Sequence, residues 1–128
     1  MADLEEVLRM HLVTASTDAQ ERIFPLRMPQ QTGLEFPLIV YQRISVPRQY
    51  TQDGDANLPK VRTQWSMWAK TYGSLTSLFE QVASALSGYT NEAEGIQSCF
   101  LGFELEEWEE QSGLFRRMLD TVVGYKGT

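Results

Sequence analysis

Histidine and cysteine are almost absent from this chain of 128 residues, which contains one of each, His11 and Cys99. A single cysteine excludes an internal disulfide and a zinc site built from several cysteines. The composition also argues against a Ser-His-Asp or Cys-His catalytic site and against a metal site built from several histidines, unless a partner chain contributes residues. His11 lies beside the apolar stripe of a predicted helix, where a packed or surface histidine is the ordinary interpretation.

Long hydrophobic runs are absent as well, since none approaches the roughly 20 residues needed to cross a bilayer. The N-terminal segment MADLEEVLRMHLV is acidic and lacks the apolar stretch of a secretory signal. The chain has 17 acidic and 11 basic residues, a net charge of −6 and a pI near 4.7. This excess of acidic residues argues against general nucleic-acid binding, because such binding depends on Lys and Arg side chains that neutralise phosphates. We therefore expect one soluble intracellular domain over residues 1–128, a binder or building block with no membrane contact.

Basic residues are missing from a long stretch, because no Lys or Arg occurs between Thr71 and Phe115. Eight glutamates lie in that stretch, and five of them are crowded near its end: Glu104, Glu106, Glu107, Glu109 and Glu110. One interpretation is a solvated face that aids solubility. The functional alternative is a surface that repels DNA or that meets a basic partner.

Hydrophobic periodicity is what the sequence does contain, and it predicts an α+β fold. Apolar residues at helical spacing predict helices over 3–13 and 74–88, with Ser74 as the cap of the second. Alternating or β-rich segments predict four main strands, over 37–51, 60–71, 97–108 and 114–125. We expect an antiparallel sheet of about four strands with two main helices packed on one face. The segment Arg22–Leu26 is expected to be a short edge strand or a tether onto the core.

Two of the predicted strands have a defined buried face. In 60–71 the residues expected to face the core are Val61, Thr63, Trp65, Met67 and Ala69. In 97–108 they are Cys99, Leu101, Phe103 and Leu105. Trp68 is an exception on the polar face of its strand, and we expect the N-terminal segment or another subunit to cover it.

Two patterns in the sequence could indicate a calcium loop or a glycosidase site, but neither pattern fits. Asp53, Asp55 and Asn57 follow the rhythm of a calcium loop, but Leu58 and Gln64 stand where such a loop needs glycine and glutamate. A hairpin turn explains these residues. Paired glutamates would suit a glycosidase, but the crowded cluster offers no separation of environments that would raise the pKa of one carboxyl. We therefore expect no enzyme, no metal site and no cofactor.

The order of motifs along the middle of the chain resembles a known family. The motifs are Arg22-Ile23-Phe24-Pro25-Leu26 and Pro29, then Phe36–Ser45 with the sequence FPLIVYQRIS, then Val61–Ala69, then the apolar helix Leu75–Leu86. In this order and at these separations they are similar to the tail-completion, or tail-terminator, proteins of long-tailed phages. The resemblance covers roughly residues 4–125.

The resemblance implies an α+β subunit of hexameric rings on the head-proximal end of a tail tube. The implied partners are copies of the chain itself, the tail tube protein and a head-completion or connector protein. DNA would pass through the ring without specific binding. The protein would be part of the virion, assembled in the cytoplasm of the host bacterium. The resemblance implies no catalytic residues, and the alternative is a head-side neck protein of the same particle.

A ring gives the charged and loop residues candidate roles, since cyclic interfaces join two different surfaces. A basic face from Arg43, Arg48, Lys60 or Arg62 is expected to meet the glutamates of residues 104–110 on the neighbouring subunit. Alternatively, glutamates such as Glu104 and Glu106 line the lumen and repel DNA. The loop Tyr50–Leu58 is expected to project from the subunit. It is expected to touch the tail tube or the next ring through Tyr50, Asp53, Asp55, Asn57 and Leu58.

Overall fold

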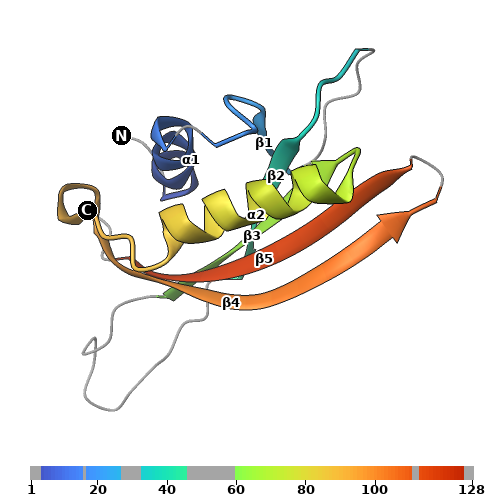
Figure 1. Ribbon diagram of the computed structural model, residues 1–128. Coiled ribbons are helices and arrows are strands. Elements are labelled where there is room, and N and C mark those ends of the chain that lie inside the picture. Colours follow the sequence, from blue (N-terminus) through green and yellow to red (C-terminus); the bar gives the residue numbers. More distant parts are fainter. Residues whose placement is uncertain (1–3, 16, 27–32, 46–59, 111–112, 126–128) are drawn as a thin grey trace.

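Two helices lie on one face of a five-stranded sheet in this computed structural model, which describes residues 4–15, 17–26, 33–45, 60–110 and 113–125 (Figure 1). The helices are α1 (Leu4–Thr14) and α2 (Tyr72–Leu86). The strands are β1 (Ile23–Pro25), β2 (Leu38–Ser45), β3 (Lys60–Ala69), β4 (Ile96–Glu109) and β5 (Leu114–Tyr125), and a short 3-10 helix, η1 (Glu92–Glu94), precedes β4. The arrangement confirms an α+β fold with both main helices on one side.

The sheet is mixed, which corrects the expectation of an antiparallel sheet of about four strands. The strand order is β1-β2-β3-β5-β4, and β2, β3, β5 and β4 pair antiparallel with their neighbours. A fifth strand, β1, pairs parallel with β2 through Ile23 and Ile39. About a dozen residues separate β1 from β2, which is enough chain for the crossover that parallel pairing requires.

The core lies between the helices and the sheet. Leu4, Leu8 and Leu12 of α1 and Leu75, Leu78, Val82 and Leu86 of α2 are almost completely buried. The predicted inner face of β3 is confirmed, because its alternate residues Val61, Thr63, Trp65, Met67 and Ala69 are all buried. Trp65 is fully buried, and its indole Nε1 donates a hydrogen bond to Thr121 Oγ1 at 3.2 Å. The opposite face of the sheet, which neither helix covers, is called the helix-free face below.

Helix α2 begins earlier than the sequence predicts, and its cap differs. Thr71 has extended backbone angles, and its side chain accepts from the Ser74 amide at 3.1 Å. Ser74 therefore supplies a donor of the first turn and does not cap the helix, so its assignment as the cap is wrong. The helix ends at Leu86, and Gly88 follows with φ of 71°. That left-handed angle suits glycine and agrees with the predicted stop.

Strand β4 contains a bulge that makes part of its predicted inner face wrong. Leu101 pairs with Thr121 and Glu104 pairs with Leu119, so two residues of β4 stand opposite Asp120 alone. An additional residue reverses the alternation of side chains beyond it. Leu101 therefore lies on the helix side, whereas Leu105 lies on the helix-free face. Only Cys99 of the predicted set is buried among the described side chains.

Candidate functional site

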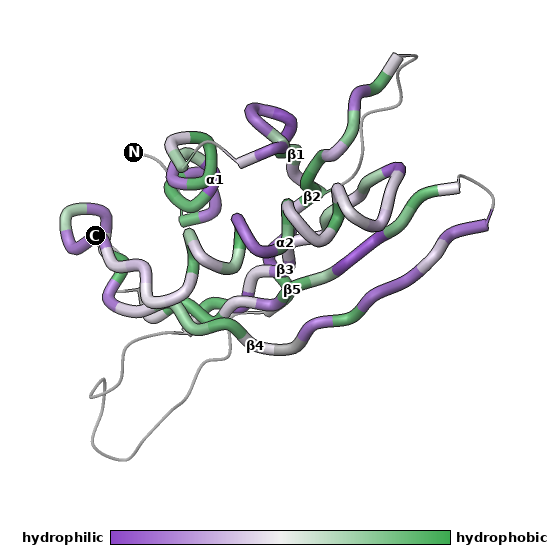
Figure 2. Tube along the Cα trace, in the orientation of Figure 1, coloured by the Kyte–Doolittle hydropathy of each residue, from purple (hydrophilic) through white to green (hydrophobic). Residues whose placement is uncertain are grey.

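The five crowded glutamates lie on the outer half of β4, the strand at one edge of the sheet. Glu104, Glu106, Glu107 and Glu109 belong to the strand, and Glu110 begins the turn after it. Every side chain from Glu104 to Glu110 is exposed. In Figure 2 the hydropathy of β4 changes along its length, from hydrophobic near Ile96 to mostly hydrophilic in the outer half. We call residues 104–110 the acidic edge.

Two arginines of the neighbouring strand β5 lie against the acidic edge. Arg117 is on the helix side, within 3.6 Å of a Glu104 oxygen and 3.2 Å of a Glu106 oxygen. Its guanidinium also lies 3.6 Å from the centre of the Phe79 ring of α2. Arg116 is on the helix-free face, 3.6 Å from Glu107. Two guanidinium groups against five carboxylates leave the acidic edge with a negative surplus.

Arg116 also contacts Trp68, for which the sequence predicted cover by the N-terminal segment or another subunit. The indole is half-buried on the helix-free face, and the Arg116 guanidinium lies 5.1 Å from its centre. Among the described residues, a β5 side chain therefore contacts this tryptophan. Cation–π contact of this kind is favourable and keeps the arginine in place beside Glu107.

Large apolar side chains are exposed on the same strand. Phe100 is 64% exposed and Trp108 is 52% exposed, and Leu101 and Leu105 are 37% and 38% exposed. The Trp108 ring lies against Phe115 in a tilted arrangement with 4.6 Å between ring centres, and Phe115 meets Tyr72 edge-on at 5.7 Å. The Tyr72 hydroxyl lies 3.2 Å from both Glu106 oxygens. Exposed aromatic side chains are enriched in surfaces that contact another protein chain.

The outer backbone edge of β4 is covered only at its beginning. The Gly88 amide donates to the Cys99 carbonyl at 2.9 Å, and Asn91 forms a bridge with Ile96. Beyond Cys99, no strand of the described chain pairs with the outer edge of β4. A long edge strand with unpaired amides and carbonyls is a ready template for another strand.

The predicted basic face lies away from the acidic edge within one subunit. Arg43 lies on the helix side of β2 and forms two contacts with Glu5 of α1, one of them Nη2 to Oε2 at 2.9 Å. Arg62 lies on the helix-free face, 3.3 Å from Asp120. Lys60 begins β3, and Arg48 lies outside the described residues. The printed contacts therefore join Arg43 to Glu5 and Arg62 to Asp120, and not to the acidic edge of the same chain.

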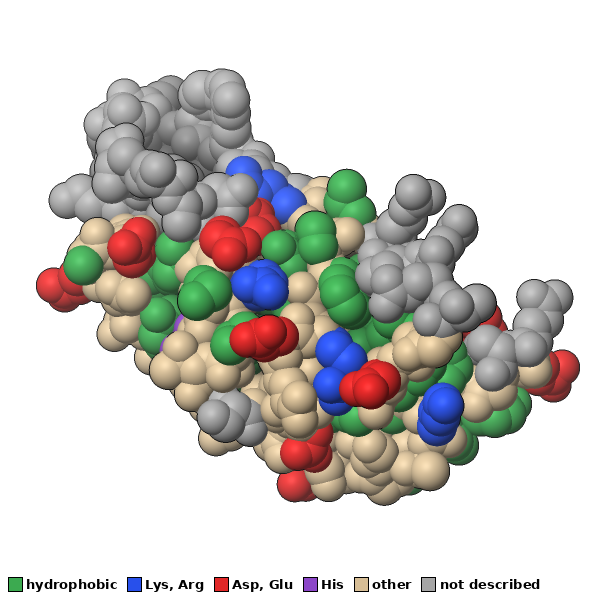
Figure 3. All heavy atoms as spheres, turned by 90° about the horizontal axis from the view of Figure 1, so that it is seen from above, with side chains coloured by type: hydrophobic (Ala, Val, Ile, Leu, Met, Phe, Trp, Pro, Cys, Tyr) green, Lys and Arg blue, Asp and Glu red, His purple; other side chains and the backbone are tan. Residues whose placement is uncertain are grey.

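Charges on the helix-covered face are mixed. In Figure 3 acidic and basic side chains alternate across this face, with hydrophobic side chains between them. Arg9 and Glu6 of α1 form one such pair at 3.6 Å. The densest cluster of acidic residues is therefore at β4, whereas charges of both signs lie on the helix-covered face.

Comparison with known proteins gives the family. The sequence matches the family described as Tail completion protein gp17 over residues 7–124. The chain belongs to this tail completion family. Its resemblance to tail-completion proteins is thereby confirmed, and it is a structural protein of the virion, in the tail and neck region. The family is one of structural tail-completion proteins and is not known as an enzyme family.

A solved structure has the same fold. The chain resembles one chain of the virion of a native gene transfer agent particle, with a TM-score of 0.62 and 12% sequence identity. The similarity covers 97% of this chain and 95% of the other. Among curated protein sequences, none matches this chain significantly.

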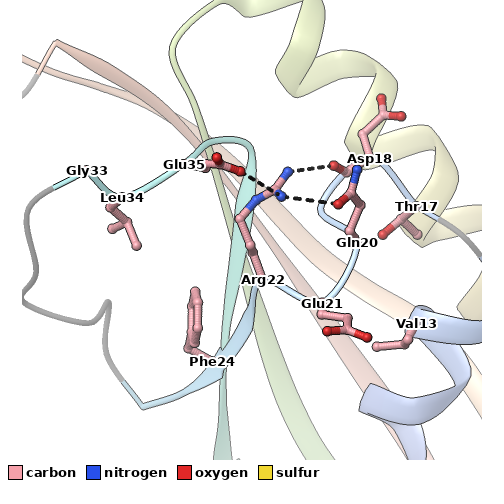
Figure 4. Close-up of a pocket in the computed structure, with 10 residues that line it drawn as sticks. All are labelled: Val13, Thr17, Asp18, Gln20, Glu21, Arg22, Phe24, Gly33, Leu34 and Glu35. Carbon is pink, nitrogen blue, oxygen red and sulfur yellow. Dashed lines mark hydrogen bonds and ion pairs between the residues drawn. The ribbon is translucent and has the colours of Figure 1, made fainter.

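Arg22, the first residue of the RIFPL motif that resembles the family, has a structural role in this tail completion protein. Arg22 borders an open hollow beside β1, where its guanidinium meets Asp18, Gln20 and Glu35 (Figure 4) and also bonds the Pro37 carbonyl. It donates to the Asp18 carbonyl at 3.0 Å and to the Pro37 carbonyl at 3.1 Å, and it lies 3.4 Å from a Glu35 oxygen. The arginine thus ties the segments before β1 and before β2 together.

The predicted loop residues Tyr50, Asp53, Asp55, Asn57 and Leu58 lie outside the described residues. Within the described ranges, no group of three or more His, Cys, Asp or Glu side chains is placed to hold a metal ion. No helix there is long and apolar enough to cross a membrane.

Sequence reasoning missed the exposed aromatic residues of the edge. Phe100, Trp108 and Tyr72 were not among the predicted site residues, although they frame the glutamates in the structure. A signal was present, because Trp108 is a tryptophan among five glutamates and Phe100 falls on the polar parity of its strand.

Proposed function

We propose that this chain forms a ring that caps the head-proximal end of the phage tail tube. The observation that carries the proposal is the match to the tail completion family over residues 7–124. The same fold in a gene transfer agent particle supports a role in a tailed assembly. The ring is expected to be hexameric, and it stops polymerisation of the tube and joins it to the head connector.

The ring requires two complementary lateral surfaces, since its interfaces join unlike faces. We assign the acidic edge to one surface and the side that carries Arg43, Arg48, Lys60 and Arg62 to the other. The negative surplus of β4 supports this assignment, because opposite charge steers and aligns partners. Exposed Phe100 and Trp108 add apolar area, which exposed charges alone do not supply.

A lumen lining is the competing role for Glu104 and Glu106. Both carboxylates lie close to Arg117, which reduces the negative potential that they present to DNA. We therefore favour the lateral interface for these two residues. The net charge of −6 still suits a ring through which DNA passes without specific binding.

Termination itself is steric and one-sided. One face of the ring matches the end of the tube, and the other face offers no copy of the tube surface, so polymerisation halts there. That second face then receives the head-completion protein. The Tyr50–Leu58 loop is proposed as the contact with the tube or the next ring, because loops on a rigid sheet commonly carry binding residues.

Purified protein and purified tail tube protein test the proposal directly. Added to elongating tubes, the chain should shorten their mean length and appear in electron micrographs as density at one end only. The matched control is the same protein heat-denatured before addition. Tubes of unchanged length with no end density would contradict the proposal and favour the head-side neck protein.

A further inference from the structure

A hollow lies where the beginning of α2 meets the outer end of the β4–β5 hairpin, at one end of the sheet (Figure 1). Its volume is about 250 Å³, and three aromatic rings, one leucine and two carboxylates line it: Tyr72, Phe115, Trp108, Leu75, Glu106 and Glu107. Pockets for small molecules commonly measure about 300–1,000 Å³. The smaller volume suits a single side chain of another chain. We call it the aromatic hollow.

The rings of the aromatic hollow pack together and still leave two of their members half exposed. Trp108 lies against Phe115 with 4.6 Å between ring centres, and Phe115 meets Tyr72 at 5.7 Å. Trp108 is 52% exposed and Tyr72 is 51% exposed. The Tyr72 hydroxyl donates to the Glu106 carboxylate at 3.2 Å, which holds a negative charge beside the rings. Aromatic faces and a carboxylate together attract a cation, because the faces also carry negative potential.

Two arginines of the same subunit show how this part of the surface holds a cation. The Arg117 guanidinium lies 3.6 Å from the centre of the Phe79 ring and forms ion pairs with two glutamates of the acidic edge. The Arg116 guanidinium lies 5.1 Å from the centre of the Trp68 ring and contacts a third glutamate. The aromatic hollow offers the same combination of rings and carboxylates. No Lys or Arg of the described chain lies over its rings.

We propose that a Lys or Arg side chain from the neighbouring copy of this chain occupies the aromatic hollow, a contact that rests on the ring proposed above. A cation gains more from an aromatic face when the pair is shielded from water, as it is inside an interface. Trp, Tyr and Arg are also enriched among the residues that dominate the binding energy of interfaces. The aromatic hollow therefore gives the lateral interface a specific anchor within its broader charge attraction.

The surroundings of the aromatic hollow favour a cation. Five carboxylates of the acidic edge stand against two guanidinium groups, those of Arg116 and Arg117. The start of α2 adds a partial positive charge of about half an elementary charge, which leaves the surplus negative. A second acidic edge would bring like charges together, so the occupant comes from a different face of the neighbour. The face proposed for the other side of the interface is the basic one.

Photo-crosslinking in assembled particles identifies the occupant. Particles are purified from a gene-deletion strain complemented with a chain that carries the photoreactive p-benzoylphenylalanine in place of Trp108. On irradiation, this variant should give crosslinked dimers of the chain, and mass spectrometry should place the junction at a Lys or Arg or at the residue next to it. The matched control carries the same group in place of Phe100, which is exposed on the helix-free face of β4 and should not join to that segment.

A double-mutant cycle tests the chemistry of the contact in the assay with elongating tubes. Trp108→Leu keeps an apolar side chain but removes the ring, and should raise the protein concentration that caps half of the tubes by about fivefold or more. Changing the crosslinked Lys or Arg to Gln should raise it by a similar factor. The double variant should cap no worse than the weaker single variant, because both changes remove one contact. Phe100→Leu is the matched control and should cap at the wild-type concentration.

The outcomes separate the contact from the proposed function. Equal capping by the wild-type chain and Trp108→Leu would overturn the contact and leave the proposed function intact. Additive losses in the double variant, a junction with a different protein, or protein at the tail end that gives no crosslinked dimer would also overturn it. No capping by the wild-type chain would overturn the ring and the contact together. Melting temperatures check that the variants fold, and Trp108→Phe, which keeps a ring, should lose less than Trp108→Leu.

Discussion

At the scale of single residues, the buried hydrogen bonds of the sheet separate two threonines that look alike in sequence. Thr121 Oγ1 accepts from the Trp65 indole at 3.2 Å and donates to the Thr63 carbonyl at 3.3 Å. The Thr63 hydroxyl is also buried but has no hydrogen-bond partner in the structure. Burying a polar group without a partner is unfavourable, whereas removing an acceptor leaves the indole donor unpaired.

Thr121→Val should therefore lower the free energy of unfolding by roughly 1–3 kcal/mol. Thr63→Val is the matched control on the neighbouring strand and should be neutral or slightly stabilising. Urea denaturation followed by tryptophan fluorescence measures both variants. Equal losses in the two variants would contradict the hydrogen-bond account of the Trp65 site.

The single cysteine gives a prediction about pH. Cys99 is 1% exposed, and burial raises the pKa of its thiol from 9.0 to about 11. The unfolded chain therefore loses this proton at lower pH than the native chain does. The stabilising contribution is complete below pH 9 and is lost as the pH rises toward 11.

The expected loss from Cys99 is about 2 kcal/mol at alkaline pH. Denaturation curves between pH 8 and pH 11 measure it, with Cys99→Ala as the control that should lose less over the same interval. In the native protein at pH 8 a thiol reagent should label Cys99 only after denaturant is added. Rapid labelling without denaturant would contradict the buried position.

At the scale of elements, the start of α2 depends on one side chain. Thr71 accepts from the Ser74 amide at 3.1 Å, which satisfies a donor of the first turn. Thr71→Ala should lower the free energy of unfolding by about 1 kcal/mol. Ser74→Ala removes no cap and should cost less than half as much. Thermal denaturation by circular dichroism compares them, and a larger loss at Ser74 would restore the predicted cap.

Periodicity predicted the elements that pack against the core. The apolar stripes of residues 3–13 and 74–88 and the alternation of 60–71 agree with α1, α2 and β3, because these elements bury one regular face. The parallel pairing of β1 was not predictable from three residues whose partner lies beyond a crossover. The bulge of β4 was missed because Leu101 and Leu105 keep the same parity in sequence on either side of it.

At the scale of the whole molecule, charge is separated along the sheet, from the acidic edge at β4 to the arginines of β2 and β3. The cluster of glutamates was evident in the sequence, whereas its position on an open edge was not. Edge position depends on strand order, and the order β3-β5-β4 places the last hairpin with β4 outermost. Identifying Arg116 and Arg117 as the partners of these glutamates also required the register between β4 and β5, which the sequence does not give.

A charge exchange tests whether this separation assembles the ring. Glu109→Lys with Glu110→Lys should weaken assembly, because both residues are exposed on the acidic edge. Arg43→Glu with Arg62→Glu should weaken it from the other face. Chains that carry all four changes should regain assembly in native mass spectrometry, with melting temperature as the control for folding. Failure of this rescue would count against pairing between the two faces.

The central claim is that the chain ends the tail tube, and the most direct measurement is electron microscopy of particles made without its gene. The account predicts unattached tails of overlong or variable length beside filled heads, because nothing halts the tube or joins it to the connector. Tails of normal length beside heads that leak DNA would contradict it and move the protein to the head side of the neck.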